Sequence, residues 1–221
     1  MRPVLATLTA LVLGSTAAAD PLETLRGVSA EGPVYAFDVE FEADGVTAIG
    51  SVDPTRPAGN RIVLTAPPRT EWSEDFAEGI AQRDREADGD IWCQNLVEQI
   101  PDTASLASDN GNSVTYTFTP VPEDGADGPE KKMFRSLVGS AVVSKTGPIL
   151  ESFQLHLPEP MKPHFLVKIE RFSMFAECER SPDGRAYLAN LNIDIAGSAM
   201  GRRFSETTAQ QITRLFEPSN S

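Results

Sequence analysis

The residues best suited to acid–base chemistry are the two histidines of the chain, His156 and His164. They flank the proline-rich segment 158–163 and could face each other across a hairpin, close to Glu159. A histidine–carboxylate pair would serve as the base of a hydrolase, and two imidazoles would supply part of a zinc site. Two ligands without a third make a poor metal site, so the sequence favours surface histidines on a polar strand face.

Acidic runs at 71–90 and 123–127 offer the oxygen ligands that calcium prefers. Neither run has the Asp-x-Asp-x-Asp-Gly spacing of a calcium loop, and a solvated helix face and an exposed loop explain them as well. The sequence also lacks a Gly-x-Ser-x-Gly elbow, a His-Glu-x-x-His pair and a phosphate-binding glycine loop. We therefore predict a protein that is not an enzyme and has no catalytic residue, metal or cofactor.

The two cysteines, Cys93 and Cys178, have no Cys-x-x-Cys spacing. An even number of cysteines in an exported chain favours one structural disulfide over a redox or metal site. The alternative is two separate buried thiols, because sequence alone does not bring the two Cα atoms within bonding distance. We predict a Cys93–Cys178 disulfide that ties a helix to the strand that carries Cys178.

Aromatic and flexible apolar side chains are numerous for one sheet face. A curved sheet that helices cover only in part can use such side chains to line a groove for an acyl chain or for an apolar segment of a partner. The alternative is an ordinary core. The candidate ligand-binding residues are Phe37, Phe41, Phe153, Phe172 and Met174, with Phe175 next to the last of them.

Residues 1–19 have the pattern of a secretory signal peptide. Arg2 precedes a short apolar run that ends at Leu13, and small residues precede Asp20. The run is shorter than the ~20 apolar residues that cross a bilayer, which argues against an N-terminal membrane anchor. We predict cleavage after Ala19, export to the periplasm, and a single domain over 20–221 without an integral membrane segment.

The charge of the predicted mature chain limits its partners. Without residues 1–19 the chain has 18 basic and 32 acidic residues, a formal net charge of −14. Such a field repels phosphate backbones and anionic lipid surfaces. We therefore predict that nucleic acid is not a partner, and that any membrane contact is apolar rather than electrostatic.

Much of the chain alternates in side-chain character with the period of two that half-buried strands require. In the C-terminal segment 140–200 the pattern recurs in one stretch after another, for example at Ile193 and Ile195. Apolar residues at four-residue spacing instead predict helices that start at Trp72 and Trp92. We therefore expect the α+β class, with a curved, mostly antiparallel sheet, an open half-barrel, covered on one face by two or three helices.

Turn and cap residues divide the rest of the chain into elements. The predicted elements are a helix over 21–27, a strand hairpin at 35–41 and 46–52, a strand at 61–66, a strand at 114–118, a helix at 130–137, strands at 140–145, 149–157, 164–178 and 186–200, and a loop at 158–163. In the strand 164–178 the apolar residues change parity at Glu170-Arg171. A bulge there would return them to one face, and the alternative is burial of both faces at different ends. Segment 203–216 suits either a helix or an edge strand, and we favour the strand.

Three motifs carry a resemblance to uncharacterised exported bacterial proteins. They are Val52-Asp53-Pro54-x-x-Pro57-Ala58-Gly59-x-Arg61, the turn between Leu137 and Ile149, and Phe172 followed by Pro182-Asp183-Gly184 and Gly197-x-x-x-Gly201. The order of segments, from signal peptide through hairpin and helices to long meandering strands, resembles the lipoprotein-carrier (LolA-like) superfamily. That resemblance implies an open half-barrel closed by helices and a carrier function.

These features together lead us to expect a non-enzymatic periplasmic binding or carrier protein. Its apolar sheet face would hold a lipid-like or other apolar ligand. One alternative is an interaction or sensor module that contacts an envelope protein. Another is a hydrolase that acts from the polar rim of the sheet with His156 or His164 as its base.

Overall fold

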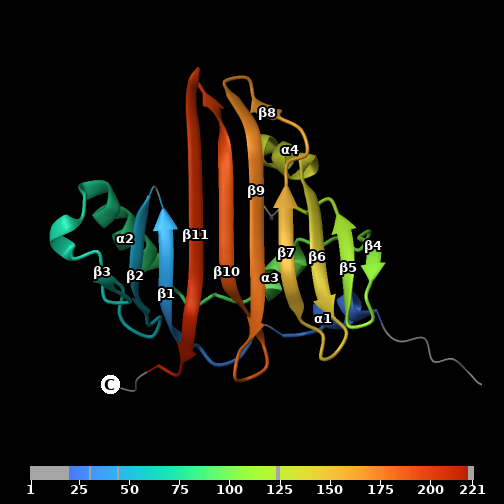
Figure 1. The fold of residues 1–221 in the computed structure, drawn as a ribbon, viewed down its shortest axis with the longest axis horizontal. Coiled ribbons are helices and arrows are strands. Elements are labelled where there is room, and N and C mark those ends of the chain that lie inside the picture. Colours follow the sequence, from blue (N-terminus) through green and yellow to red (C-terminus); the bar gives the residue numbers. More distant parts are fainter. Residues whose placement is uncertain (1–19, 30, 44, 123–124, 219–221) are drawn as a thin grey trace, which may run out of the picture.

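The computed structural model describes residues 20–29, 31–43, 45–122 and 125–218, which form an open antiparallel sheet with helices on one side (Figure 1). The predicted α+β class is therefore confirmed. The predicted signal peptide lies outside the described residues. No helix in the described ranges is both long and apolar enough to cross a membrane.

Eleven strands in the described residues pair into this one sheet. They are β1 (Ala36–Ala43), β2 (Val46–Val52), β3 (Ile62–Ala66), β4 (Ser105–Asp109), β5 (Ser113–Phe118), β6 (Val138–Ser144), β7 (Leu150–His156), β8 (Met161–His164), β9 (Val167–Arg180), β10 (Ala186–Ala199) and β11 (Arg202–Phe216). Their order across the sheet is β3-β2-β1-β11-β10-β9-β7-β6-β5-β4, and β8 also pairs with β9. The C-terminal strand β11 thus joins the N-terminal hairpin to the meander β9–β10.

Four helices lie in the described residues: α1 (Pro21–Arg26), α2 (Glu74–Glu86), α3 (Gln94–Glu98) and α4 (Gly128–Ser136). Side-chain caps explain where three of them begin, because a carboxylate or hydroxyl accepts a free backbone N–H of the first turn. Asp20 accepts from Leu22 N at 3.1 Å and Ser73 accepts from Phe76 N at 3.2 Å. A single 3₁₀ turn, η1 (Arg69–Glu71), precedes α2.

The helices divide the interior into two hydrophobic cores. The first core packs α1 and α3 against β5, β6, β7 and β9 around Phe153, which is fully buried. The second packs Ile80 of α2 against β1 and β2, where Phe37 and Phe41 are buried. The predicted disulfide is confirmed: Cys93, just before α3, bonds to Cys178 of β9 with the two Cα atoms 6.4 Å apart.

The two ambiguous segments form strands. Ala196 pairs with Arg171 and Gly197 pairs with Ile169, so Glu170 is the extra residue of a bulge in β9. The bulge restores the apolar parity, as predicted. Segment 203–216 lies within β11, so the preference for a strand over a helix is also confirmed. The expected edge position is wrong, because β11 lies between β1 and β10 inside the sheet.

Three further local predictions differ from the structure. Residues 161–163, expected in the loop 158–163, form β8 together with His164. Pro163 is tolerated there because β8 pairs only with β9 and Pro163 needs no ladder hydrogen bond. Strand β4 was not expected, since all its side chains are exposed and it shows no apolar alternation. Helix α3 is shorter than expected: Trp92 precedes it and pairs with Tyr187 in an isolated bridge.

The motif 52–61 folds as a tight loop that is fastened to α2. The carboxylate of Asp84, a residue only 4% exposed, accepts the backbone N–H of Gly59 and that of Ile62, the latter at 2.7 Å. Asp53 organises the start of the loop by accepting from Thr55 N at 3.1 Å and from the Thr55 hydroxyl at 2.6 Å. The motif 52–61, which resembles uncharacterised exported bacterial proteins, therefore consists of residues that stabilise the fold.

Replacing Asp84 by alanine should lower the free energy of unfolding by about 3 kcal/mol, because two backbone donors lose a charged acceptor. Urea unfolding followed by circular dichroism measures the change. Asp84→Asn keeps one acceptor oxygen and should lose about half as much. Glu78→Ala, on the exposed side of the same helix, is the matched control and should change stability little. Equal losses in Asp84→Ala and Glu78→Ala would contradict this role.

Candidate functional site

The sheet has two unlike faces. Away from the helices, β10 presents Asn190, Asn192 and Asp194, and Asn190 pairs with Gln211 of β11. A shallow cavity of about 150 Å³ on this side is lined by polar side chains, Glu40 among them. This face is therefore wetted by solvent.

On the opposite face, the central strands carry apolar side chains at every second residue. Met174 of β9 pairs with Ile193 of β10, and Phe172 pairs with Ile195. The ring of Phe204 in β11 lies over Gly197, where an added Cβ would come 3.0 Å from it. The five large side chains are half-buried, and we call them the open apolar face: Phe172, Met174, Ile193, Ile195 and Phe204.

The helices leave this face incompletely covered. Helix α2 packs against β3, α1 and α3 pack against β6 and β7, and α4 packs against β8. In Figure 1, no helix of the described residues lies behind the upper halves of β10 and β11. Phe172 and Met174 border the first core, whereas Ile193 and Ile195 belong to neither core. The open apolar face thus begins where the first core ends.

The structure separates the five predicted lining residues into two groups. Phe37, Phe41 and Phe153 are at most 6% exposed, and they lie in two different cores. Only Phe172 and Met174 belong to the open apolar face. Ile193 and Ile195 were recognised as one face of a strand but not as candidates. Phe204 was missed because its segment suited a helix as well as a strand.

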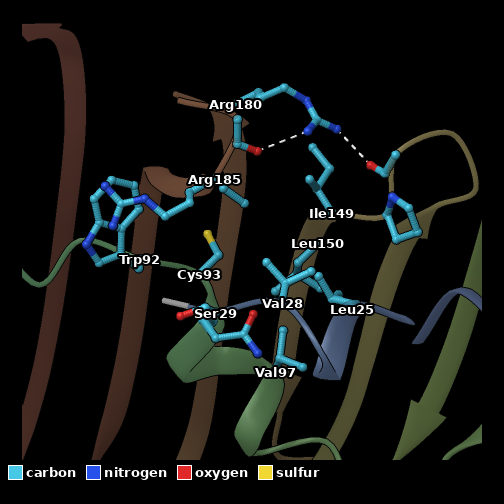
Figure 2. A pocket seen from close by; sticks show the side chains of 15 residues that line it. Leu25, Val28, Ser29, Trp92, Cys93, Val97, Ile149, Leu150, Arg180 and Arg185 are labelled. Atoms are coloured by element: carbon cyan, nitrogen blue, oxygen red, sulfur yellow. Dashed lines mark hydrogen bonds between the residues drawn. The ribbon is translucent and has the colours of Figure 1, made fainter. Parts of the chain in front are cut away.

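A cavity of about 270 Å³ lies beside the disulfide, between α1, α3 and the turns that follow β6 and β9 (Figure 2). Its wall is mainly apolar and includes the side chains of Leu25, Val97 and Leu150 (Figure 2). Ligand pockets for small molecules usually span about 300–1,000 Å³. The cavity is therefore at the lower limit for a ligand site.

Two arginines at this cavity hold the surrounding turns together. Arg180 donates to the carbonyl oxygens of Gly184 at 3.0 Å and Gly147 at 2.7 Å, as the dashed lines in Figure 2 show. The Arg185 guanidinium lies 3.4 Å from the centre of the Trp92 ring. These contacts link the β6–β7 turn, the β9–β10 turn and the segment before α3. We assign the cavity a structural role.

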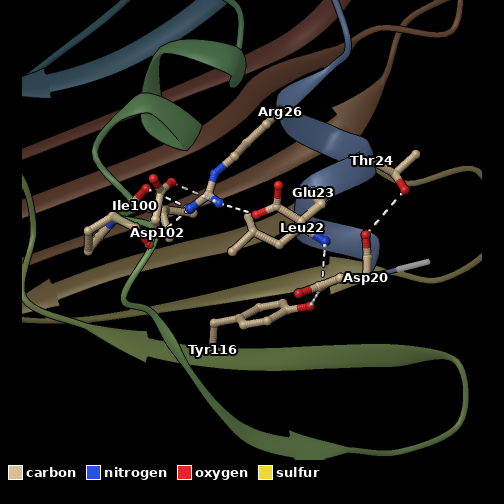
Figure 3. A network of polar contacts seen from close by, with 9 residues as sticks. Asp20, Leu22, Glu23, Thr24, Arg26, Ile100, Asp102 and Tyr116 are labelled. Carbon is tan, nitrogen blue, oxygen red and sulfur yellow. Dashed lines mark hydrogen bonds and ion pairs between the residues drawn. The ribbon is translucent and has the colours of Figure 1, made fainter. Parts of the chain in front are cut away.

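A polar network fastens α1 to the sheet edge (Figure 3). The Tyr116 hydroxyl of β5 donates to the Asp20 carboxylate, and Arg26 donates to the carbonyl of Ile100 at 3.0 Å. Burial, together with the hydrogen bond to Asp20, raises the pKa of Tyr116 to about 12. The hydroxyl therefore stays protonated at neutral pH and acts as a donor rather than as a base.

The structure does not bring the two histidines together. His156 lies opposite Ser173 and His164 lies opposite Val167, so they are six residues apart along β9. At the rise of a strand this is roughly 20 Å. The His164 ring instead packs against Phe165, with ring centres 4.4 Å apart. Within the described ranges, no group of three potential ligands among His, Cys, Asp and Glu could hold a metal ion.

The open apolar face is therefore the candidate functional site. Its chemistry is that of a binding surface, since the side chains that compose it offer no acid, base or nucleophile. Comparison with known proteins adds no relative: no family model, no curated protein and no solved structure matches the chain.

Proposed function

We propose that the protein is a non-catalytic periplasmic binding or carrier protein that holds an acyl chain or a similar apolar ligand against the open apolar face. The observation that carries the proposal is a continuous row of half-buried Phe, Met and Ile side chains on paired central strands. Contiguous apolar surface outside a core is typical of interaction sites. Met174 adds a flexible side chain that can adapt to ligands of different shape.

The border of the open apolar face limits the ligand. On β11, Thr208 pairs with Ile193 and the exposed Glu206 pairs with Ile195. A carboxylate at this position repels an anionic head group, while a hydroxyl accepts or donates a hydrogen bond. The expected ligand is an apolar chain with an uncharged or zwitterionic polar end.

Export is part of the same proposal. Residues 1–19, which lie outside the described ranges, would be removed as a signal peptide, so that the mature chain begins at Asp20. The Cys93–Cys178 disulfide is compatible with an oxidising compartment. An acyl-chain carrier is useful in such a compartment because lipids must cross water between membranes.

Native mass spectrometry of protein purified from the periplasm without reductant tests both the bound apolar ligand and the removal of residues 1–19. We expect a polypeptide that starts at Asp20 and a retained lipid-sized mass that denaturation releases. A bare polypeptide would contradict the carrier proposal. A polypeptide that still contains residues 1–19 would contradict cleavage at the proposed position.

Binding of the neutral dye N-phenyl-1-naphthylamine tests the position of the site. The double variant Met174→Ser and Ile193→Ser should weaken dye affinity about tenfold or more, because two paired apolar contacts are lost. The matched control is Phe175→Ser, next to Met174 but on the polar face, where Phe175 is 36% exposed. Unchanged affinity in the folded double variant, or an equal loss in the control, would place the dye elsewhere.

A further inference from the structure

Two hairpin turns lie side by side at one end of the sheet, the upper end in Figure 1. Phe165 and Leu166 form the turn between β8 and β9, and Met200 and Gly201 form the turn between β10 and β11. The backbone N–H of Met200 donates to the carbonyl of Leu166 at 2.9 Å, which joins the two turns. The strands behind them are the long central ones, β9, β10 and β11, of 14, 14 and 15 residues.

The joined turns expose large apolar side chains. Phe165 is 81% exposed, Met200 is 77% exposed and Leu166 is 45% exposed. Two of these values are the highest for any large apolar residue in the described ranges. We call the three residues the apolar tip. Burying them would remove a substantial apolar surface from water.

The turn at Met200 is not explained by backbone preference. Met200 has φ 49° and Gly201 has φ 78°, so both turn residues occupy the left-handed region. Asn-Gly or Asp-Gly is the usual pair for such a turn, and methionine is strained there. A residue chosen for the turn alone would be asparagine. The methionine side chain is therefore better explained by what it contacts outside the fold.

Basic residues surround the apolar tip. Helix α4 and segments 161–170 and 200–206 contain seven basic and three acidic residues, whereas the whole chain has a formal net charge of −13. The basic residues are Lys131, Lys132, Arg135, Lys162, Lys168, Arg202 and Arg203. Lys132 donates to the carbonyl of Lys162, which fixes α4 beside β8. Glu170 is paired with Lys168 at 2.8 Å, so these two charges cancel and the region keeps an excess of four basic residues.

We propose that this end of the sheet docks on an anionic phospholipid membrane, with the apolar tip inserted among the lipids. The order of groups along the sheet suits the depth profile of a bilayer, because the apolar residues lie in the turns and the cations lie on the strands and the helix next to them. Each basic residue near an anionic surface strengthens binding about fivefold. At this end we expect attraction in place of the repulsion predicted for the acidic chain as a whole, because basic residues outnumber acidic ones seven to three.

Vesicle flotation with the purified, disulfide-bonded protein tests this proposal. We expect binding to vesicles of phosphatidylglycerol and phosphatidylethanolamine, weaker binding as NaCl is raised, and little binding to phosphatidylcholine alone. Phe165→Ser should reduce partitioning about tenfold. Leu106→Ser is the matched control, because Leu106 is 64% exposed on edge strand β4, and it should bind as the wild type does.

Met200→Asn separates a membrane role from a structural one. Asparagine suits the turn, so the variant should have a higher Tm while its vesicle partitioning falls about tenfold. A second variant, Phe165→Trp, reports on insertion. Brominated lipids should quench its tryptophan fluorescence more than they quench that of the wild type. The proposal is overturned if the wild-type protein does not float, if it binds phosphatidylcholine equally, or if Met200→Asn binds as the wild type does.

The membrane proposal does not depend on the open apolar face. Met174→Ser with Ile193→Ser should lose dye binding yet float with vesicles as the wild type does. Phe165→Ser should show the opposite pattern. If either variant lost both dye binding and vesicle binding, the open apolar face and the apolar tip would not be separate binding surfaces.

Discussion

A variant with alanine at both Cys93 and Cys178 is expected to unfold with a free energy about 4 to 5 kcal/mol lower than the wild type. The disulfide closes a loop with a sequence separation of 85 residues, and removing that cross-link restores conformational freedom to the unfolded chain. Typical domains are stable by only about 5–15 kcal/mol, so the loss is a large fraction of the total. Urea unfolding followed by tryptophan fluorescence measures it.

Reduction provides the control for the disulfide prediction. Dithiothreitol should lower the stability of the wild-type protein toward that of the variant and leave the variant unchanged. Both half-cystines are less than 9% exposed, so reduction should be efficient only near the unfolding transition. A variant within about 1 kcal/mol of the wild type would show that the cross-link constrains little of the unfolded chain.

Phe153→Ala is expected to lower the free energy of unfolding by about 3 to 5 kcal/mol, because the vacated volume cannot be refilled. Phe153 is fully buried, and its partners in register on both sides, Ala141 of β6 and Ala176 of β9, are small and also fully buried. The Phe118 ring packs on it with centres 5.6 Å apart. One large ring thus fills the space that two alanines leave.

Two further phenylalanine variants calibrate that result in the same unfolding experiment. Phe153→Leu should cost less than Phe153→Ala, because most of the apolar volume is kept. Phe165→Ala removes the same ring from a site that is 81% exposed and should change stability by less than about 0.5 kcal/mol. Similar losses of unfolding free energy for Phe153→Ala and Phe165→Ala would mean that the cavity left by the Phe153 ring does not cause the destabilisation.

The distribution of charge over the fold differs from what the net charge of the chain suggests. The formal net charge is −13, which on its own argues against contact with anionic lipids. The structure gathers α4, the β8–β9 turn and the β10–β11 turn at one end, and basic residues are in excess there. Screening limits charge effects to about 10 Å in salt, so the membrane proposal depends on the charges near the two turns rather than on the net charge of the chain. Only the fold reveals which charged residues lie within that screening length of one another.

Local patterns predicted most of the elements correctly. The Asp20 cap and Pro21 predicted α1, and alternating residues predicted the β1–β2 hairpin and the long C-terminal strands. Such signals are local, because caps and periodicity act within a few residues. The bulge at Glu170 could also be predicted, since it appears as a change of parity within one strand.

The sequence by itself thus determined the α+β class and the antiparallel strands, whereas the structure decided that Cys93 and Cys178 lie within bonding distance. Only the tertiary structure decided which apolar residues are core and which form a surface. Phe153 and Phe172 both lie in alternating strands, yet only Phe172 remains half-exposed. The reason is physical: periodicity assigns a side chain to a face, but burial depends on whether a distant helix covers that face. The joining of the turns at Phe165 and Met200 likewise follows from the pairing of β9 with β10.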